Sequence, residues 1–209
     1  MKKNILNFLI IILTIALIVV LSMIIIKYTK NYLNEKDVEE TLAIIESEFD
    51  KITNNEINDK DEENKKDLLD VNYKGYKIEG IIEIPKIGIK YPIINETTDE
   101  AMLISITKFW GPQPNEIGNY IVAGHNNRDG TMFGKTKYLE IGDIIKLTNL
   151  KNETIEYEVF NIYSIDPNDL SIIESVDKKS REITLITCTN GHINRLVTRA
   201  REIKTNINF

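Results

Sequence analysis

The chain has few of the residues that form disulfides or bind soft metals. Its 209 residues include one cysteine, Cys188, and two histidines, His125 and His192. One cysteine excludes a disulfide within the chain. One thiol and two imidazoles supply three or four soft ligands only with help from carboxylates, which argues against a structural zinc site. We therefore expect no cofactor, and the role of the unpaired thiol becomes the main question.

An excess of basic residues is also missing. Lysine and arginine together number 26 against 32 aspartates and glutamates, so the formal net charge is −6. A protein that binds nucleic acid needs a basic face that neutralises phosphates. The composition therefore predicts no nucleic-acid partner.

Charge is absent from a long segment near the N-terminus. Phe8 to Ile26 is apolar except for Thr14 and Ser22. About 20 such residues, at a helical rise of 1.5 Å each, cross a hydrocarbon core of about 30 Å. A cleaved signal peptide has a shorter apolar region and a small-x-small cleavage site, and no such site follows here. The segment is typical of an uncleaved anchor that contacts membrane lipid through residues 8–26, rather than of a buried core helix.

The charges on either side of this anchor give little guidance about its orientation, so the orientation is inferred mainly from the large domain that follows it. Lys2 and Lys3 precede the span, and Lys27 and Lys30 follow it, so the positive-inside bias is slight. The large domain after the span fits export of the C-terminal part. We expect a single-pass protein of the cell membrane, with a cytoplasmic N-terminus and the rest outside.

The remaining chain divides into a stalk and a folded domain. We predict residues 1–27 as cytoplasmic tip and anchor, 28–75 as a stalk or linker, and 76–209 as the catalytic domain. The stalk begins with a helical apolar spacing at Val38, Leu42, Ile45, Phe49 and Ile52. Asn54 to Asp70 has too few apolar residues to offset the entropy of ordering, which favours a flexible linker.

From Tyr76 onward the pattern favours short strands separated by glycine and proline turns. The predicted strands are Tyr76 to Glu83, Ile87 to Ile94, Tyr120 to Gly124, Ile144 to Leu150, Thr154 to Ile165, Ile183 to Cys188 and Arg195 to Ile203. Two short helices are predicted, Thr98 to Ser105 with Thr98 as N-cap, and Thr131 to Tyr138. A mainly β fold with short helices, as a closed or nearly closed barrel, is the expected architecture.

Three chemically useful side chains lie near the ends of these strands. Cys188 ends one strand, Arg195 begins the next, and His125 ends an earlier one. If the last two strands form a hairpin, Cys188 faces Arg195. Arg199 is then about 13 Å further along, at about 3.3 Å per residue. A thiolate is the reactive form of cysteine, and an imidazole can give a proton to a leaving amine. A guanidinium can hold an oxyanion or a substrate carbonyl.

The same residues resemble those of sortases, the membrane-anchored cysteine transpeptidases of Gram-positive bacteria. Thr184-Leu185-Ile186-Thr187-Cys188 resembles their TLxTC signature, and Ala123-Gly124-His125-Asn126 is similar to their histidine motif. Arg195 to Ala200 is similar to their last strand, whose first arginine is catalytic. Ile84 to Ile89, Phe133 to Lys135 and Gly142-Asp143 fit an early strand and a mid-domain helix. The resemblance covers about Tyr76 to the C-terminus and the anchor.

The resemblance implies a sortase-type barrel with Cys188 as nucleophile, His125 as general acid and base, and Arg195 as oxyanion or substrate stabiliser. Its donors would be surface proteins with a C-terminal sorting signal, often LPxTG-like and cut between Thr and Gly. Its acceptor would be a peptidoglycan precursor or another amine. Thr187 would contact substrate or orient the site, and His192 is a weaker substrate-binding candidate.

Departures from the family pattern bear on subclass and on calcium. The chain has no C-terminal membrane segment, and Asp166 to Arg181 is too short for the long helix of class B enzymes. A class A-like or class D-like enzyme fits better. Asp129 and Glu140 leave a calcium site, known in some sortases, as an alternative to solvent-facing carboxylates.

Three other functions are weighed against this interpretation. An L,D-transpeptidase also uses cysteine and histidine, but its serine-histidine-glycine-cysteine motif is absent from the sequence. A catalytically inactive sortase-like barrel, acting as a membrane-anchored binding module, would not need the intact triad. A simple adhesion or scaffold domain would not need these three residue types in this order.

Overall fold

A computed structural model describes residues 2–58, 71–175, 177, 179–189, 191 and 193–204. The chain divides into two compact units, residues 1–40 and 41–209. His192 lies outside the described residues, as do residues 59–70 of the predicted linker.

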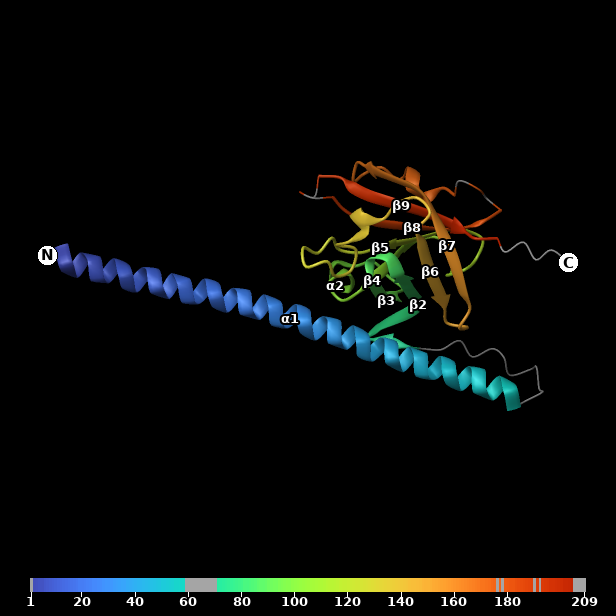
Figure 1. The fold of residues 1–209 in the computed structure, drawn as a ribbon, viewed down its shortest axis with the longest axis horizontal. Coiled ribbons are helices and arrows are strands. Elements are labelled where there is room, and N and C mark those ends of the chain that lie inside the picture. Colours follow the sequence, from blue (N-terminus) through green and yellow to red (C-terminus); the bar gives the residue numbers. More distant parts are fainter. Residues whose placement is uncertain are drawn as a thin grey trace. The chain divides into compact units, whose positions relative to one another are not determined.

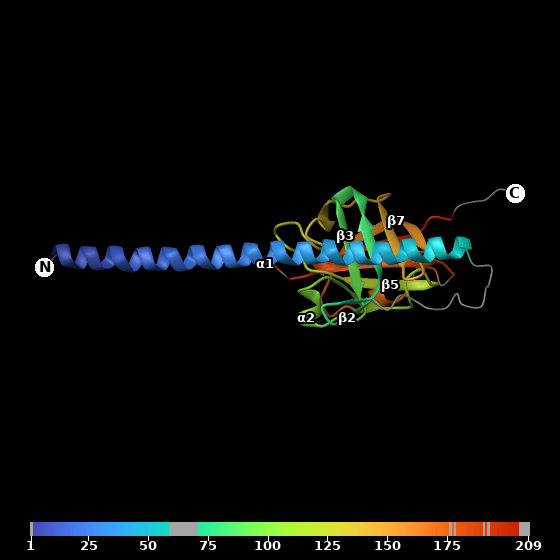
Figure 2. The same cartoon turned by 90° about the horizontal axis from the view of Figure 1, so that it is seen from below.

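The first element is one long helix, α1 (Lys2–Asn58), which both views show as continuous (Figures 1 and 2). Among the described residues, this is the helix that is long and apolar enough to span a membrane, with a mean hydropathy of 3.4 and none of its apolar window buried. Its continuation into the second unit carries buried Leu42, Ile45 and Phe49, as the predicted apolar spacing requires. The helix extends to Asn58, so the prediction of a linker from Asn54 onward is wrong for its first residues.

The second unit is a β-barrel, whose strands enclose a common interior in Figure 1. The strands are β1 (Asn72–Tyr73), β2 (Tyr76–Ile84), β3 (Ile89–Ile94), β4 (Ile106–Trp110), β5 (Gly118–Ala123), β6 (Ile144–Asn149), β7 (Thr154–Ile165), β8 (Arg181–Cys188) and β9 (Arg195–Glu202). Their order is β1-β2-β3-β4-β5-β8-β9-β7-β6. A further β2–β6 pairing closes strands β2 to β9 into a barrel, which confirms the predicted closed β fold.

Short helical turns join some of these strands. They are η2 (Pro85–Ile87), α2 (Asp99–Met102), η3 (Thr136–Tyr138) and η4 (Ser171–Ile173). The Thr98 hydroxyl accepts a hydrogen bond from the Ala101 amide at 3.0 Å, which confirms the predicted N-cap of α2. Closing the barrel buries large side chains from remote strands, including Ile82, Tyr120, Leu147 and Tyr157.

The structure adds one strand to the predicted elements and corrects three of them. Strand β4 was not predicted; it is short and ends at Trp110, next to a glycine–proline turn. Strand β3 begins at Ile89 rather than Ile87, because Gly88 adopts a left-handed conformation with φ 64° and ends η2. Helix α2 stops at Met102, since Ser105 is buried and donates to the Pro92 carbonyl.

The predicted helix Thr131 to Tyr138 is reduced to the single turn η3. Gly134 lies so close to the Asn127 carbonyl that a Cβ atom would meet that oxygen at 2.1 Å. The chain therefore folds back on itself at Gly134 instead of continuing a helix from Thr131.

Candidate active site

The parallel pair β5 and β8 brings His125 and Cys188 to the same end of the barrel. Their register pairs Ala123 with Ile186. His125 comes two positions after Ala123, and Cys188 comes two positions after Ile186. Extending the register therefore places His125 level with Cys188 on the neighbouring strand. The sequence motifs are 63 residues apart, and the pairing of two remote strands joins them.

Three hydrogen bonds fix this junction. The Gly124 amide donates to the Ile186 carbonyl at 3.1 Å, and the Thr187 hydroxyl donates to the Gly124 carbonyl at 2.6 Å. The Asn126 side-chain amide donates to the Cys188 carbonyl at 2.7 Å. Contacts on both sides of His125 therefore tie its backbone to the strand that carries Cys188.

The hairpin of β8 and β9 brings Arg195 to the thiol. Cys188 pairs with Arg195 in the antiparallel register, and Arg195 Nη1 lies 3.5 Å from Cys188 Sγ. Arg199 pairs instead with Thr184, further down the strand. The predicted register is confirmed: Arg195, rather than Arg199, faces the cysteine. The Cys188 thiol is free, and both Cys188 and Arg195 are half-buried, so the thiol is partly open to solvent.

A glycine beneath the histidine allows the loop that follows to pack closely. A Cβ atom on Gly124 would lie 2.8 Å from the buried Phe133 ring. The Phe133 amide also donates to the His125 carbonyl at 2.9 Å. Gly124 thus lets the aromatic ring sit directly under the strand end, and this packing fixes the backbone of His125.

The thiol lies on the outer face of the barrel. Strands β7 and β8 run parallel with β9 between them, so the chain joining them must cross one face of the sheet. Ile172 of this connection packs with Ile186, Val197 and Ile121 in a buried cluster. Because alternate residues of a strand share a face, Cys188 lies on the same side as Ile186.

The opposite face of β5 points into the barrel and holds no candidate residue. Burial raises the pKa of Tyr120 well above its ordinary value, and its hydroxyl donates to Glu79 at 3.1 Å. Glu79 also pairs with Lys108 at 3.1 Å. Glu79 and Lys108 therefore neutralise each other's charge, and neither contacts the thiol.

The carboxylates suggested for calcium already have protein partners. Asp129 accepts hydrogen bonds from the Thr131 amide at 3.1 Å and from its hydroxyl at 2.7 Å. Glu140 and Asp143 both pair with Lys86, and these two contacts raise the pKa of the lysine. Within the described part of the chain, no group of three or more His, Cys, Asp or Glu side chains is arranged to hold a metal ion.

Sequence reasoning assigned no role to two residues that shape this region. Asn126 follows the histidine directly, and its bond to the Cys188 carbonyl was not foreseen. Glu182 is the one carboxylate in the apolar strand β8, which could have indicated that its partners lie on β9. A thiol, a guanidinium and an imidazole at three neighbouring strand ends can together attack a carbonyl, hold the resulting oxyanion and protonate a leaving group.

Comparison with known proteins agrees with this geometry. The sortase domain model matches residues 82–203, more than half of the chain. The chain belongs to the sortase family. Sortase A of Listeria monocytogenes is 35% identical over 118 residues, covering 56% of this chain and 52% of the relative. Sortase A of Bacillus anthracis is 32% identical over 115 residues, covering 54% of this chain and 53% of the relative. The chain thus spans about half the length of these two curated sortases.

Solved sortase structures share the fold. The Clostridium perfringens Sortase D5 transpeptidase aligns with a TM-score of 0.63 and 28% identity, covering 82% of this chain and 98% of that one. Sortase A from Corynebacterium diphtheriae aligns with a TM-score of 0.57 and 26% identity, covering 64% of both chains. A class A-like or class D-like sortase is consistent with these matches.

Proposed function

We propose that this sortase is a cysteine transpeptidase, with Cys188 as nucleophile, His125 as general acid and base, and Arg195 as oxyanion or substrate stabiliser. The register of β5, β8 and β9 is the observation that carries the proposal. It aligns the three residues at one end of the barrel, with Arg195 Nη1 3.5 Å from Cys188 Sγ. The donor is a surface protein with an LPxTG-like sorting signal, and the acceptor is a cell-wall amine.

Acylation begins with attack of the Cys188 thiolate on the carbonyl of the signal threonine. A carbon–sulfur bond forms, and the electron pair of the carbonyl moves to its oxygen. Arg195 donates to that oxyanion, as a fixed cation does best where charge develops. The threonine–glycine bond then breaks, and protonated His125 gives its proton to the leaving glycine amine. The product is a thioester on Cys188.

Deacylation reverses these roles with a different amine. The acceptor amine attacks the thioester carbonyl while neutral His125 takes its proton. The new carbon–nitrogen bond forms as the carbon–sulfur bond breaks, and Cys188 leaves as a thiolate beside Arg195. No cofactor enters either step.

The buried contacts of Thr187 support a positioning role rather than direct substrate contact. The Thr187 hydroxyl donates to the Gly124 carbonyl at 2.6 Å, and Thr187 is 4% exposed. Together with Asn126, it holds the histidine loop against the end of β8. Thr187 therefore acts on the relative position of His125 and Cys188.

The test uses the full-length protein in detergent micelles, LPxTG-like peptides and an oligoglycine or diaminopimelate-type amine. Mass spectrometry should find a thioester adduct at Cys188 and an amine-linked product, and added amine should speed turnover. Cys188→Ala should abolish both species, and His125→Ala should nearly abolish turnover. Cleavage that persists in Cys188→Ala, or the absence of any adduct, would favour the binding-module alternative.

We also propose that residues 28–209 lie outside the cell and that the N-terminus is cytoplasmic. The apolar segment of α1 supports the anchor, and the need to meet surface proteins supports the orientation. Protease added to intact protoplasts should remove the barrel. Full protection of the barrel in intact protoplasts, with digestion after lysis, would show the opposite orientation.

A further inference from the structure

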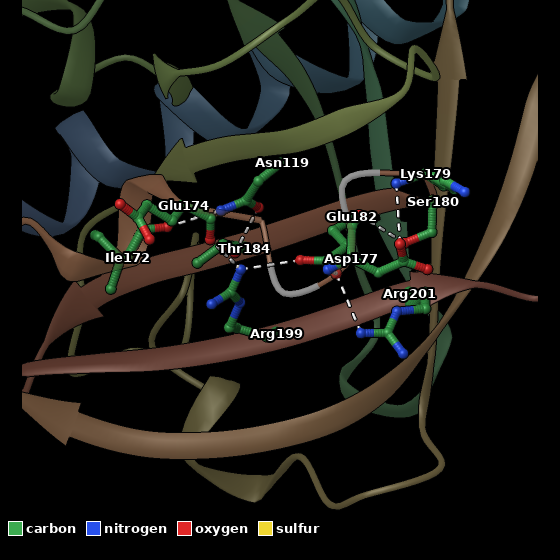
Figure 3. Close-up of polar contacts among 10 residues, drawn as sticks. All are labelled: Asn119, Ile172, Glu174, Asp177, Lys179, Ser180, Glu182, Thr184, Arg199 and Arg201. Carbon is green, nitrogen blue, oxygen red and sulfur yellow. Dashed lines mark hydrogen bonds and ion pairs between the residues drawn. The ribbon is translucent and has the colours of Figure 1, made fainter.

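A buried carboxylate lies on the outer face of β8, away from the proposed catalytic residues. The Glu182 side chain is 0% exposed, and Figure 3 shows it between Arg199 and Arg201 of the neighbouring strand. Its two oxygens lie 2.9 Å from Arg199 Nη2 and 3.1 Å from Arg201 Nη2. Arg201 also lies over the Phe160 ring of β7, at 4.6 Å from the ring centroid. Burying a charge is unfavourable unless such partners neutralise it.

The same charged group holds the chain that crosses from β7 to β8. We call its described residues, 166–175, 177, 179 and 180, the crossing connection. Glu182 accepts a hydrogen bond from the Asp177 amide at 3.0 Å. Arg199 Nη2 donates to the Glu174 carbonyl at 2.6 Å. The ion pair therefore binds the backbone of the crossing connection at two points: Glu182 at the Asp177 amide, and Arg199 at the Glu174 carbonyl.

A neutral pair adds a third tether. The Asn119 side-chain amide of β5 donates to the Ile172 carbonyl at 2.7 Å, and the Thr184 hydroxyl of β8 donates to the Asn119 side-chain oxygen at 2.7 Å. Figure 3 shows this pair beside the charged group, reaching the crossing connection from the same face of the sheet. Both Asn119 and Thr184 are buried, so water does not replace these contacts easily.

These tethers act next to the proposed nucleophile. Ile172 of the crossing connection packs on Ile186 and Val197. Ile186 lies two positions before Cys188, and Val197 lies two positions after Arg195, so each shares a strand face with a proposed catalytic residue. A peptide that reaches the Cys188 thiol must lie on this outer face, alongside the crossing connection.

We propose that Glu182 is a positioning residue for the acyl donor. With Arg199, it fixes the crossing connection in the place that the bound sorting peptide requires. The role toward the sorting peptide rests on the proposed function, whereas the tethering of the crossing connection by Glu182 and Arg199 is independent of it. Because Glu182 touches neither the thiol nor Arg195, its loss should weaken donor binding and leave the reactivity of Cys188 intact.

The first test compares Glu182→Gln with wild type, using the full-length protein in micelles. We expect KM for the sorting peptide to rise about tenfold, equivalent to about 1.4 kcal/mol, with kcat nearly unchanged. The rate of Cys188 alkylation by iodoacetamide should also stay unchanged. Glu79→Gln is the matched control, because Glu79 is also a partly buried carboxylate, and it pairs with Lys108 and Tyr120 rather than with the crossing connection.

A double variant separates positioning from stability. Glu182→Met/Arg199→Met replaces the buried pair with apolar side chains, a change that often preserves or raises stability. If the pair only stabilises the fold, KM should return to the wild-type value. If it positions the crossing connection, KM should stay raised, because the Asp177 amide and the Glu174 carbonyl have lost their partners. This variant also replaces Glu182→Gln if that protein fails to fold.

Hydrogen exchange tests the tethering without any substrate. Peptides covering residues 171–175 should exchange faster in the Glu182 variants and in Asn119→Ala, but not in Glu79→Gln. Unchanged exchange there, or an unchanged KM in a folded variant, would overturn the positioning role. If the wild-type protein processes no sorting peptide, the proposed function is overturned instead. The exchange experiment would still decide whether Glu182 holds the crossing connection.

Discussion

Replacing Arg195 with alanine is the sharpest test of the proposed site. Arg195 Nη1 lies 3.5 Å from Cys188 Sγ, and the two residues are paired across the β8–β9 hairpin. The change removes the cation that would face both the thiolate and the oxyanion, while the backbone pairing that holds the hairpin stays in place. We expect the chemical step to slow while the barrel remains folded.

The magnitude follows from charge and distance. Two unit charges about 4 Å apart near a protein surface attract by about 4 kcal/mol, and solvent at half-buried side chains screens part of this. Removing one donor from an oxyanion site raises a barrier by about 2.7–4 kcal/mol. We therefore expect Arg195→Ala to lower kcat/KM by about 100-fold. Arg195→Lys should recover part of the loss, because it keeps the charge without the planar fork.

The assay is steady-state cleavage of a fluorogenic sorting peptide by the full-length protein, together with thermal unfolding of each variant. Arg181→Ala is the matched control: Arg181 begins β8 at the far end of the hairpin, where it pairs with Glu202 at 2.7 Å. We expect the control to lose stability and keep its kcat. An Arg195→Ala protein with wild-type kcat/KM would refute the role of Arg195 and the reasoning from the register.

Three further changes test how the structure supports the site. Arg199→Ala leaves the buried Glu182 carboxylate without a main partner; removing one member of a buried pair costs about 3–5 kcal/mol, so scanning calorimetry should show Tm lower by roughly 10 °C. Gly124→Ala would push on the Phe133 ring, which a Cβ would meet at 2.8 Å; we expect about 1–3 kcal/mol of destabilisation and a lower kcat, measured by denaturant unfolding and peptide cleavage. Thr98→Ala removes the N-cap of α2; it should cost about 1 kcal/mol in denaturant unfolding and leave kcat unchanged.

Much of the fold could be predicted from local pattern. The uncharged run from Phe8 to Ile26 indicated a membrane anchor, and the alternation of apolar residues indicated most of the barrel strands. The same alternation put Cys188 and Arg195 on one face of a hairpin, which the register confirms. The strand predictions succeed because successive side chains of an extended chain point to opposite faces, so the local pattern shows which residues share a face.

Elements that depend on tertiary contacts or on tight backbone packing were predicted poorly. Strand β4 is five residues long, and its pairings with β3 and β5 define it as a strand. The helix predicted from Thr131 shrinks to one turn because Gly134 packs against the Asn127 carbonyl. At β4, pairing with other strands outweighs the local propensity, and at Gly134 a backbone contact within the same loop ends the predicted helix.

The sequence by itself determined the long apolar segment near the N-terminus, the mainly β domain and the pairing of Cys188 with Arg195 across the hairpin. The tertiary structure decided which remote strands become neighbours. Parallel pairing of β5 with β8 puts His125 level with Cys188, and the crossing connection buries Glu182 between two arginines. Such pairings depend on closing the whole barrel around one core, and no local run of residues contains that information.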